Sequence, residues 1–147
     1  MQQAVDDINA RYDAVLAALE SHATTRVVKA SFYRDIGVHT DAELAQGVVM
    51  MMLASEGGYT NNFAMQAKLG ETQLRIVYHL HAGSEAEPKA TRIAEGEAAE
   101  EVKAFVRAGV AGLSLELVDV QFSRQLDHPY GWIVATVRAV APKSNEY

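Results

Sequence analysis

The sequence LRIVYHLH at residues 74–81 alternates apolar and polar side chains over most of its length. Because successive side chains of a β-strand point to opposite faces, one face of this strand carries only large apolar or aromatic groups. These are Leu74, Ile76, Tyr78 and Leu80, and the opposite face carries Arg75, Val77, His79 and His81. The stretch therefore predicts a half-buried strand whose apolar face needs a covering layer of helices.

Two segments have the helical periodicity that such a layer requires. Residues 3–21 place apolar side chains at intervals of three and four, at Val5, Ile8, Tyr12, Val15, Leu16 and Leu19. Residues 91–108 have an inner stripe of Ala94, Ala98, Val102, Phe105 and Val106. We expect the charged residues between them to face water, namely Glu95, Glu97, Glu100, Glu101 and Lys103. Gly109 follows at a position where helices commonly end in glycine.

The remaining apolar segments predict further strands. Residues 26–34 alternate, residues 61–69 and 73–81 form a pair, and residues 113–124 and 131–141 form a closing hairpin. Residues 45–55 are ambiguous, because the run VVMMML at 48–53 suits either a central strand covered on both faces or a buried helix, and Thr40 is suited to cap a helix that starts at Asp41. The length of the run and the glycines that follow it, Gly57 and Gly58, favour the strand.

The element order expected from these segments is α-β-β-β-β-α-β-β. It indicates an α+β fold in two layers, with an antiparallel or mixed β-sheet and two helices packed on one face. The length of 147 residues suits one domain. We expect that domain to occupy residues 1–142 and to be followed by a flexible C-terminal tail at residues 143–147.

Composition argues against several classes of function. The chain has no cysteine, which rules out disulfides and thiolate metal sites and fits a reducing cytoplasm. The net charge of -6 argues against nucleic-acid binding, because phosphate contacts need clustered lysine and arginine. The longest apolar run, residues 47–54, is far shorter than the ~20 residues that span a bilayer, and the N-terminal segment lacks the pattern of a secretory signal. We therefore expect no membrane association.

The histidines are the first candidates for chemistry. His79 and His81 leave the same face of one strand, a spacing that can chelate a metal ion, but a site needs a third ligand such as His39 or His128. The sequence has no nucleophile motif around any serine and no carboxylate pair in an apolar setting. We expect no enzyme activity, no cofactor and no metal. A small-molecule or catalytic site built on Tyr78, His79 and His81 is the less favoured alternative.

The most unusual stretch is SRQLDHPYGW at residues 123–132. Its proline and glycine are typical of a turn, and it holds the only tryptophan of the chain, Trp132. Two interpretations stay open and are compatible with each other. The loop ends a well-packed hairpin with Trp132 in the core, or it forms an exposed contact loop, because arginine, tyrosine and tryptophan contribute most to binding at interfaces.

The order of these elements resembles that of the tail terminators of long-tailed, lambda-like phages. The closing hairpin turn, QLDHPYGW, is also similar to tail-terminator sequences. The resemblance covers nearly the whole chain and lies in the order of the elements and in their general pattern of apolar and polar residues. The matching parts are the helix at residues 5–19, the apolar strand at 48–53, LRIVYHLH at 74–81, the helix AEEVKAFVRAG at 99–109 and GWIVATVRAV at 131–140.

This resemblance implies a structural virion protein without catalytic residues. Tail terminators form a ring of six copies that caps the finished tail tube, stops its polymerisation and joins it to the head connector. The implied partners are other copies of this chain, the tail tube protein and the head-tail connector or neck protein. The implied location is the head-proximal end of the virion tail, after assembly in the host cytoplasm. The alternatives are a neck or head-completion protein of the same particle and a cytoplasmic protein-binding adaptor domain.

A ring needs contact surfaces, and strand edges and long loops commonly supply them. We expect contacts in the loops at residues 55–62, 83–88 and 124–132. The candidate interaction residues are Glu56, Tyr59, Asn61, Asn62, Arg124, Asp127, His128 and Tyr130.

Overall fold

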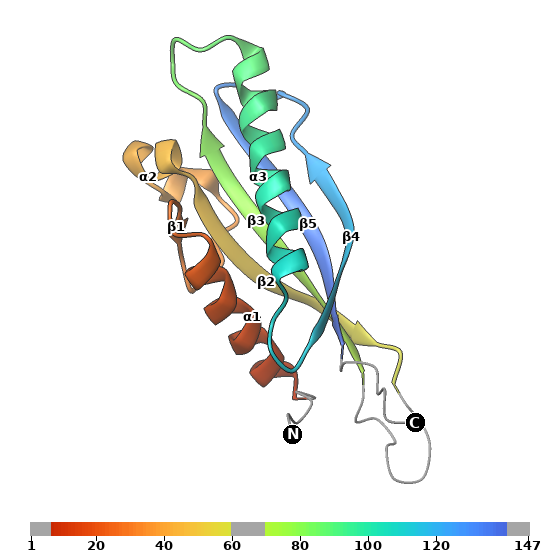
Figure 1. The fold of residues 1–147 in the computed structure, drawn as a ribbon. Coiled ribbons are helices and arrows are strands. Elements are labelled where there is room, and N and C mark those ends of the chain that lie inside the picture. Colours follow the sequence, from red (N-terminus) through yellow and green to blue (C-terminus); the bar gives the residue numbers. More distant parts are fainter. Residues whose placement is uncertain (1–6, 60–69, 141–147) are drawn as a thin grey trace, which may run out of the picture.

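The computed structural model describes residues 7–59 and 70–140. Within them the chain forms one five-stranded mixed sheet with the strand order β1-β2-β3-β5-β4 (Figure 1). The strands are β1 (Val27–Val28), β2 (Val48–Gly57), β3 (Glu71–His81), β4 (Ser114–Phe122) and β5 (Tyr130–Val140). The helices are α1 (Ile8–His22), α2 (Asp41–Gln46) and α3 (Pro88–Ala108), with a 3-10 turn, η1 (Ile36–Val38). Only the β1–β2 pair is parallel.

The main core lies between the sheet and two helices, as predicted. Helices α1 and α3 cover the same face of the sheet (Figure 1), α1 with Val15 and Leu19 and α3 with Val102 and Phe105. The alternation predicted for β3 is confirmed, because its apolar set is buried under these helices. The sheet residues buried there include Leu74, Ile76, Tyr78, Leu80, Ile133, Ala135 and Val137. The α+β class with two helices on one face is therefore confirmed.

The ambiguous segment contains both a short helix and a strand. Helix α2 ends at Gln46, and β2 starts two residues later. The Thr40 side chain accepts a hydrogen bond from the Glu43 amide, and the Glu43 side chain accepts one from the Thr40 amide, which makes a capping box. The first half of β2 is buried on both faces, as the favoured interpretation required. Val49 and Met51 join the main core, whereas Met50 packs on the other face.

The predicted strand at residues 26–34 is wrong beyond its first residues. Only Val27 and Val28 pair with β2. The Lys29 amide still donates to the carbonyl of Val49, and the chain then crosses the face of the sheet that α1 and α3 leave open. It does so because Phe32 and Ile36 pack there, against the cluster of Leu44, Val48, Met50 and Val77. Apolar burial on the second face thus replaces further strand pairing.

Two helix boundaries and part of the element order also differ from the prediction. Helix α1 begins at Ile8 instead of residue 3, because Asp7 is extended and its carboxylate accepts a hydrogen bond from the Ala10 amide at 2.9 Å. Helix α3 begins at Pro88 instead of residue 91, with proline in the first turn, where no intrahelical donor is needed. The order of the described helices and strands is α-β-α-β-β-α-β-β.

Several predictions fall on parts of the chain that lie outside the described residues. They concern Val5, the strand at residues 61–69, and the boundary between the domain and the tail at residues 142–143. Among the described residues, no helix is both long enough and apolar enough to cross a membrane.

Candidate functional site

The predicted interaction residues fall into two groups at opposite ends of β3. Gly57 pairs with Glu71 at one end, which places Glu56 and Tyr59 there. His81 pairs with Tyr130 at the other end, beside the loop that holds Arg124, Asp127 and His128. A strand rises by ~3.3 Å per residue, so the two groups are separated by roughly 30 Å. They cannot form one site within a single copy. Asn61 and Asn62 lie outside the described residues.

Glu56 belongs to a buried polar network. Its carboxylate accepts a hydrogen bond from the Thr72 hydroxyl at 2.9 Å and lies 3.8 Å from the guanidinium of Arg11. Arg11 is fully buried and donates to the Gly70 carbonyl and the Thr72 hydroxyl. A hydrogen bond to Glu56 raises the pKa of the exposed Tyr59 phenol. The network holds the ends of α1, β2 and β3 together. Glu56 therefore stabilises the fold, in addition to any contact that it makes with a partner.

The loop of residues 124–129 supports a projecting turn at the opposite end. We define this turn, residues 83–87 between β3 and α3, as the tip. His128 Nε2 donates to the Ala86 carbonyl at 2.8 Å, its Nδ1 lies 2.6 Å from the Thr91 hydroxyl, and the Gln125 side chain donates to the Pro88 carbonyl at 2.8 Å. These bonds hold the tip and the start of α3 in place. The predicted contact residue His128 therefore supports the tip.

Glu95 fastens the closing hairpin to α3, contrary to the prediction that it faces water. Its carboxylate is buried and accepts hydrogen bonds from the amide of Ser123 at 3.3 Å, from the hydroxyl of Ser123 and from the amide of Trp132 at 3.1 Å. Three donors compensate for the removal of the charge from water. A Cβ atom on Gly131 would approach Glu95 Oε2 to 2.6 Å, so this position requires glycine.

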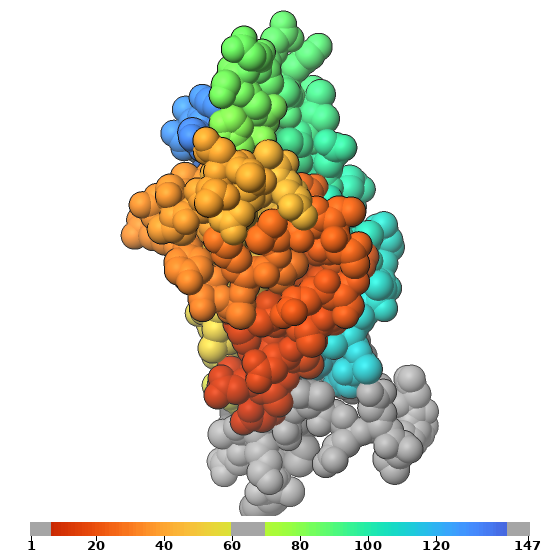
Figure 2. All heavy atoms as spheres, turned by 90° about the vertical axis from the view of Figure 1, so that its left-hand side faces the viewer, coloured from red at the N-terminus to blue at the C-terminus, as the bar shows by residue number. Residues whose placement is uncertain are grey.

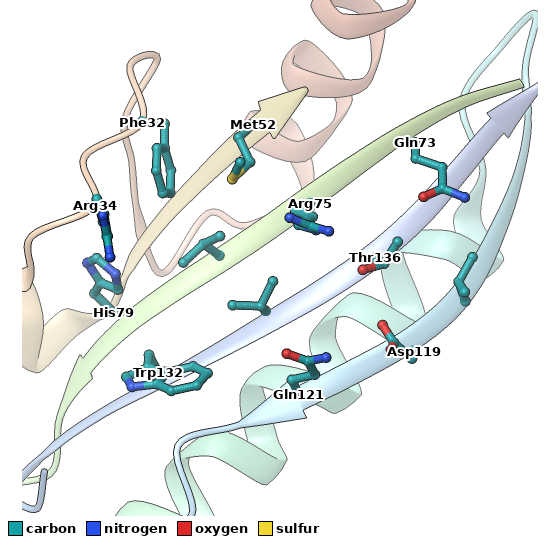
Figure 3. Close-up of a pocket in the computed structure, with 13 residues that line it drawn as sticks. Phe32, Arg34, Met52, Gln73, Arg75, His79, Asp119, Gln121, Trp132 and Thr136 are labelled. Carbon is teal, nitrogen blue, oxygen red and sulfur yellow. The ribbon is translucent and has the colours of Figure 1, made fainter. Parts of the chain in front are cut away.

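A concave surface lies on the face of the sheet that α1 and α3 leave uncovered, which we call the open face. A hollow of about 650 Å³ spans β2, β3, β5 and β4 there (Figure 3). Its apolar walls include Phe32, Met52, Val77, Val118, Trp132 and Val134. Its polar groups are Arg34, Gln73, Arg75, His79, Asp119, Gln121 and Thr136. The prediction that Trp132 lies in the core is wrong, since its side chain is half-buried and lines this hollow.

A chain of hydrogen bonds fixes the protonation of the histidine in the hollow. Lys29 Nζ lies 2.8 Å from His39 Nδ1, and His39 Nε2 lies 3.0 Å from His79 Nδ1. An ammonium group can only donate, so His39 Nδ1 accepts, His39 Nε2–H donates and His79 Nδ1 accepts. His79 therefore keeps its proton on Nε2. Burial, and secondarily the neighbouring His39, lowers the pKa of His79 to about 4, and burial also lowers the pKa of His39.

The paired histidines that suggested a metal site do not act together. His79 bonds to His39, whereas His81 Nδ1 accepts from the Gly83 amide at 3.0 Å and the His81 ring stacks edge-on against Tyr130. In the described ranges, 7–59 and 70–140, no three histidine, aspartate or glutamate side chains lie close enough together to hold a metal ion.

The hollow carries two positive charges, from Arg34 and Arg75, and one negative charge, from Asp119. No carboxylate in the described part of the chain lies within 4.0 Å of the guanidinium nitrogens of Arg34 or Arg75. Arg138 on the same face is different, because it lies 3.6 Å from Glu71 and 3.4 Å from Glu116. Asp119 supplies one carboxylate to the lining. Arginine donors among apolar walls suit the recognition of carboxylates.

Sequence reasoning missed this hollow, although part of its signal was present. The alternation of β3 places Arg75 and His79 on one face, but it does not show that Arg34 and Trp132 meet them from other segments. A scan against models of known protein families finds no match to this chain, and a search of curated proteins finds none either. The geometry therefore carries the functional interpretation.

Proposed function

We propose that this protein is a structural, non-enzymatic component of a phage tail. In this role it forms a ring of six copies that caps the finished tail tube, stops its polymerisation and provides the joint to the head connector. Its partners are other copies of itself, the tail tube protein and the connector or neck protein. It is assembled in the host cytoplasm and stays at the head-proximal end of the virion tail.

The observation that carries this proposal is the exposed open face beside an exposed sheet edge. Strand β4 is the last strand of the sheet, and its side chains Val118 and Phe122 are 48% and 41% exposed. The hollow adds the partly exposed Trp132 on β5, the strand next to this edge, and the partly exposed Phe32 over β2 and β3. Exposed apolar side chains beside a strand edge are typical of surfaces that another protein chain covers.

The arrangement is compatible with a ring. The tip and the Glu56 end lie at opposite ends of β3, and the hollow lies on the open face between them. Contacts between two different surfaces of the same chain are heterologous, and such contacts close into a ring when the rotation between copies allows it. A neck or head-completion protein of the same particle uses the same kind of contact and remains the second candidate.

The test of this role is the length of tail tubes. The tail tube protein encoded in the same genome is polymerised with and without the purified full-length chain, and the tubes are measured by electron microscopy. We expect the chain to form a ring at one tube end and to stop elongation there. Tubes that keep growing, with no density at their ends, would contradict the terminator role. A ring that binds the connector instead of the tube would favour the neck alternative.

A further inference from the structure

The hollow has the features of a receptor for carboxylate groups. Arg34 and Arg75 reach it from different segments of the chain, and Figure 3 shows both among its lining residues. His79 is 6% exposed, lines the hollow, and has an Nε2–H without a hydrogen-bond partner among the described residues. All three groups are donors, and two carry a positive charge in a chain whose net charge is -6. The matching ligand is an anionic acceptor.

The tip has the features of the matching ligand. Glu85 and Glu87 are exposed, and neither side-chain carboxylate has an ion-pair or hydrogen-bond partner within residues 7–59 and 70–140. Two acidic residues on the middle of α3 differ, because Glu100 pairs with Lys103 and Glu101 with Arg26. The tip is thus a site of uncompensated negative charge, as the hollow is of positive charge.

The shape of the tip suits insertion into a neighbour. Figure 2 shows the green atoms of this region standing above the rest of the molecule, with the end of the closing hairpin in blue beside them. The His128 ring donates to the Ala86 carbonyl of the tip. On either side of the tip, the Gln125 side chain donates to the Pro88 carbonyl, and the Ala82 amide donates to the Pro129 carbonyl at 2.8 Å. A pre-organised projection loses less conformational entropy on binding than a loose loop does.

We infer that the tip of one copy binds in the hollow of the next copy, with Glu85 and Glu87 beside Arg34, Arg75 and His79. The contact rests on the proposed ring and names the two surfaces that join its members. The tip follows the His81 end of β3, whereas the hollow lies across the middle strands. In the proposed ring, each copy offers its tip to one neighbour and its hollow to the other, which is a head-to-tail contact.

Charge exchange between the two surfaces tests this contact. The tip variant carries Glu85→Lys and Glu87→Lys, and the hollow variant carries Arg34→Glu and Arg75→Glu. Alone, each variant places like charges against each other at every contact. Mixed in equal amounts, they alternate around the ring and place opposite charges at every contact. A control variant carries Glu97→Lys and Arg107→Glu, which exchanges two exposed charges elsewhere on α3.

The readout is the assembly state of the full chain by sedimentation velocity over a range of concentrations. We expect each variant alone to need a roughly 100-fold higher concentration than the parent to assemble. The mixture should assemble within roughly tenfold of the parent's concentration, and the control should assemble like the parent. If the parent assembles and both variants also assemble, the tip-and-hollow contact is overturned while the ring stands. The same holds if the parent assembles and the mixture stays dissociated. If the parent stays monomeric in solution, parent and variants are compared on tail tubes, and a parent that also binds no tube end overturns the proposed ring, and this contact with it.

Cross-linking gives an answer even if a charge-reversed variant does not fold. The chain has no cysteine, so Glu85→Cys in one sample and Arg75→Cys in another supply the only thiols when the two are mixed. We expect the mixture to form a disulfide-linked dimer of the two variants under mild oxidation. Pairing Arg75→Cys with Glu97→Cys serves as the control. Equal dimer yields for both pairs would overturn the contact.

Discussion

At the scale of single residues, the fold depends on two charged side chains that are fully enclosed. Arg11 links α1 to the start of β3, and Glu95 links α3 to the closing hairpin. Both charges have hydrogen-bond partners, which is the condition under which burial of a charge is tolerated. Removing either side chain therefore leaves groups that have lost both water and their partner.

The first prediction concerns Glu95. Glu95→Ala leaves the amides of Ser123 and Trp132 and the Ser123 hydroxyl without an acceptor, so we expect the free energy of unfolding to fall by about 3 kcal/mol. Urea denaturation followed by the fluorescence of Trp132 measures this change. Glu97→Ala is the control, because Glu97 lies on the same helix and is exposed. This substitution should change the free energy of unfolding by less than about 0.5 kcal/mol. Equal effects of both substitutions would contradict the role given to Glu95.

The second prediction is a pH dependence caused by His79. Its pKa of about 4 in the folded protein lies below the ordinary value of 6.5, so between these values the unfolded chain binds a proton that the folded chain does not. The contribution of His79 to the free energy of unfolding is therefore fully present above pH 6.5. It decreases as the pH falls toward 4, by at most roughly 3 kcal/mol. Beside burial, His39 lowers the pKa of His79 and Asp35 opposes it, whereas Lys29 lowers the pKa of His39 and both Glu43 and Asp35 oppose it.

The control for this pH dependence is His79→Gln, which cannot take up a proton. Urea denaturation of parent and variant at pH 7, pH 5.5 and pH 4.5 separates this contribution from the general titration of carboxylates. We expect the variant to lose less stability than the parent over this range. A variant with the same loss would show that His79 is not the titrating group.

Residue by residue, the sequence predicted apolar burial better than polar burial. The alternation of β3 and the inner stripe of α3 identified core residues such as Ile76, Tyr78, Val102 and Phe105 correctly. Glu95 was assigned to water, because a helical pattern does not show donors that arrive from residues 123 and 132. Periodicity reports which face a side chain occupies, whereas the partners of a buried charge come from distant parts of the chain.

At the scale of elements, short segments are where sequence and structure differ. The strand predicted at residues 26–34 had the right alternation, but only two residues pair because Phe32 and Ile36 find an apolar surface across the open face. The run at 48–53 looked ambiguous because its first half is covered on both faces. Long elements with a single apolar face, such as β3, β5 and α3, were placed correctly to within a few residues.

The third prediction concerns α2, which has six residues and depends on its cap. Thr40→Ala removes the hydroxyl that accepts from the Glu43 amide, so we expect a loss of about 1 kcal/mol in the free energy of unfolding. Thr24→Ala, at an exposed turn position, is the control and should be close to neutral. Denaturation curves of both variants measure the difference. An equal loss in both would mean that the cap does not stabilise α2.

At the scale of the whole molecule, the two faces of the sheet differ in kind. Helices α1 and α3 complete one face, whereas the other keeps a hollow with apolar walls and two arginines without carboxylate partners among the described residues. The alternation of β3 placed Arg75 and His79 on one face, but it could not reveal the whole hollow, because four strands and a crossing segment build it together. Within a single copy, the two arginines of the hollow have no ion pair among the described residues. In the proposed ring, the tip of the next copy supplies their partners.

The most direct test of the account is the mass of the purified full chain in solution. Light scattering coupled to size-exclusion chromatography is run from micromolar to millimolar concentration, alone and with tail tubes. The proposed ring should appear as a closed species of six times the chain mass of 16.0 kDa, at high concentration or on tube ends. A mass of 16.0 kDa at every concentration, together with tubes that bind no copies of the chain, would contradict it.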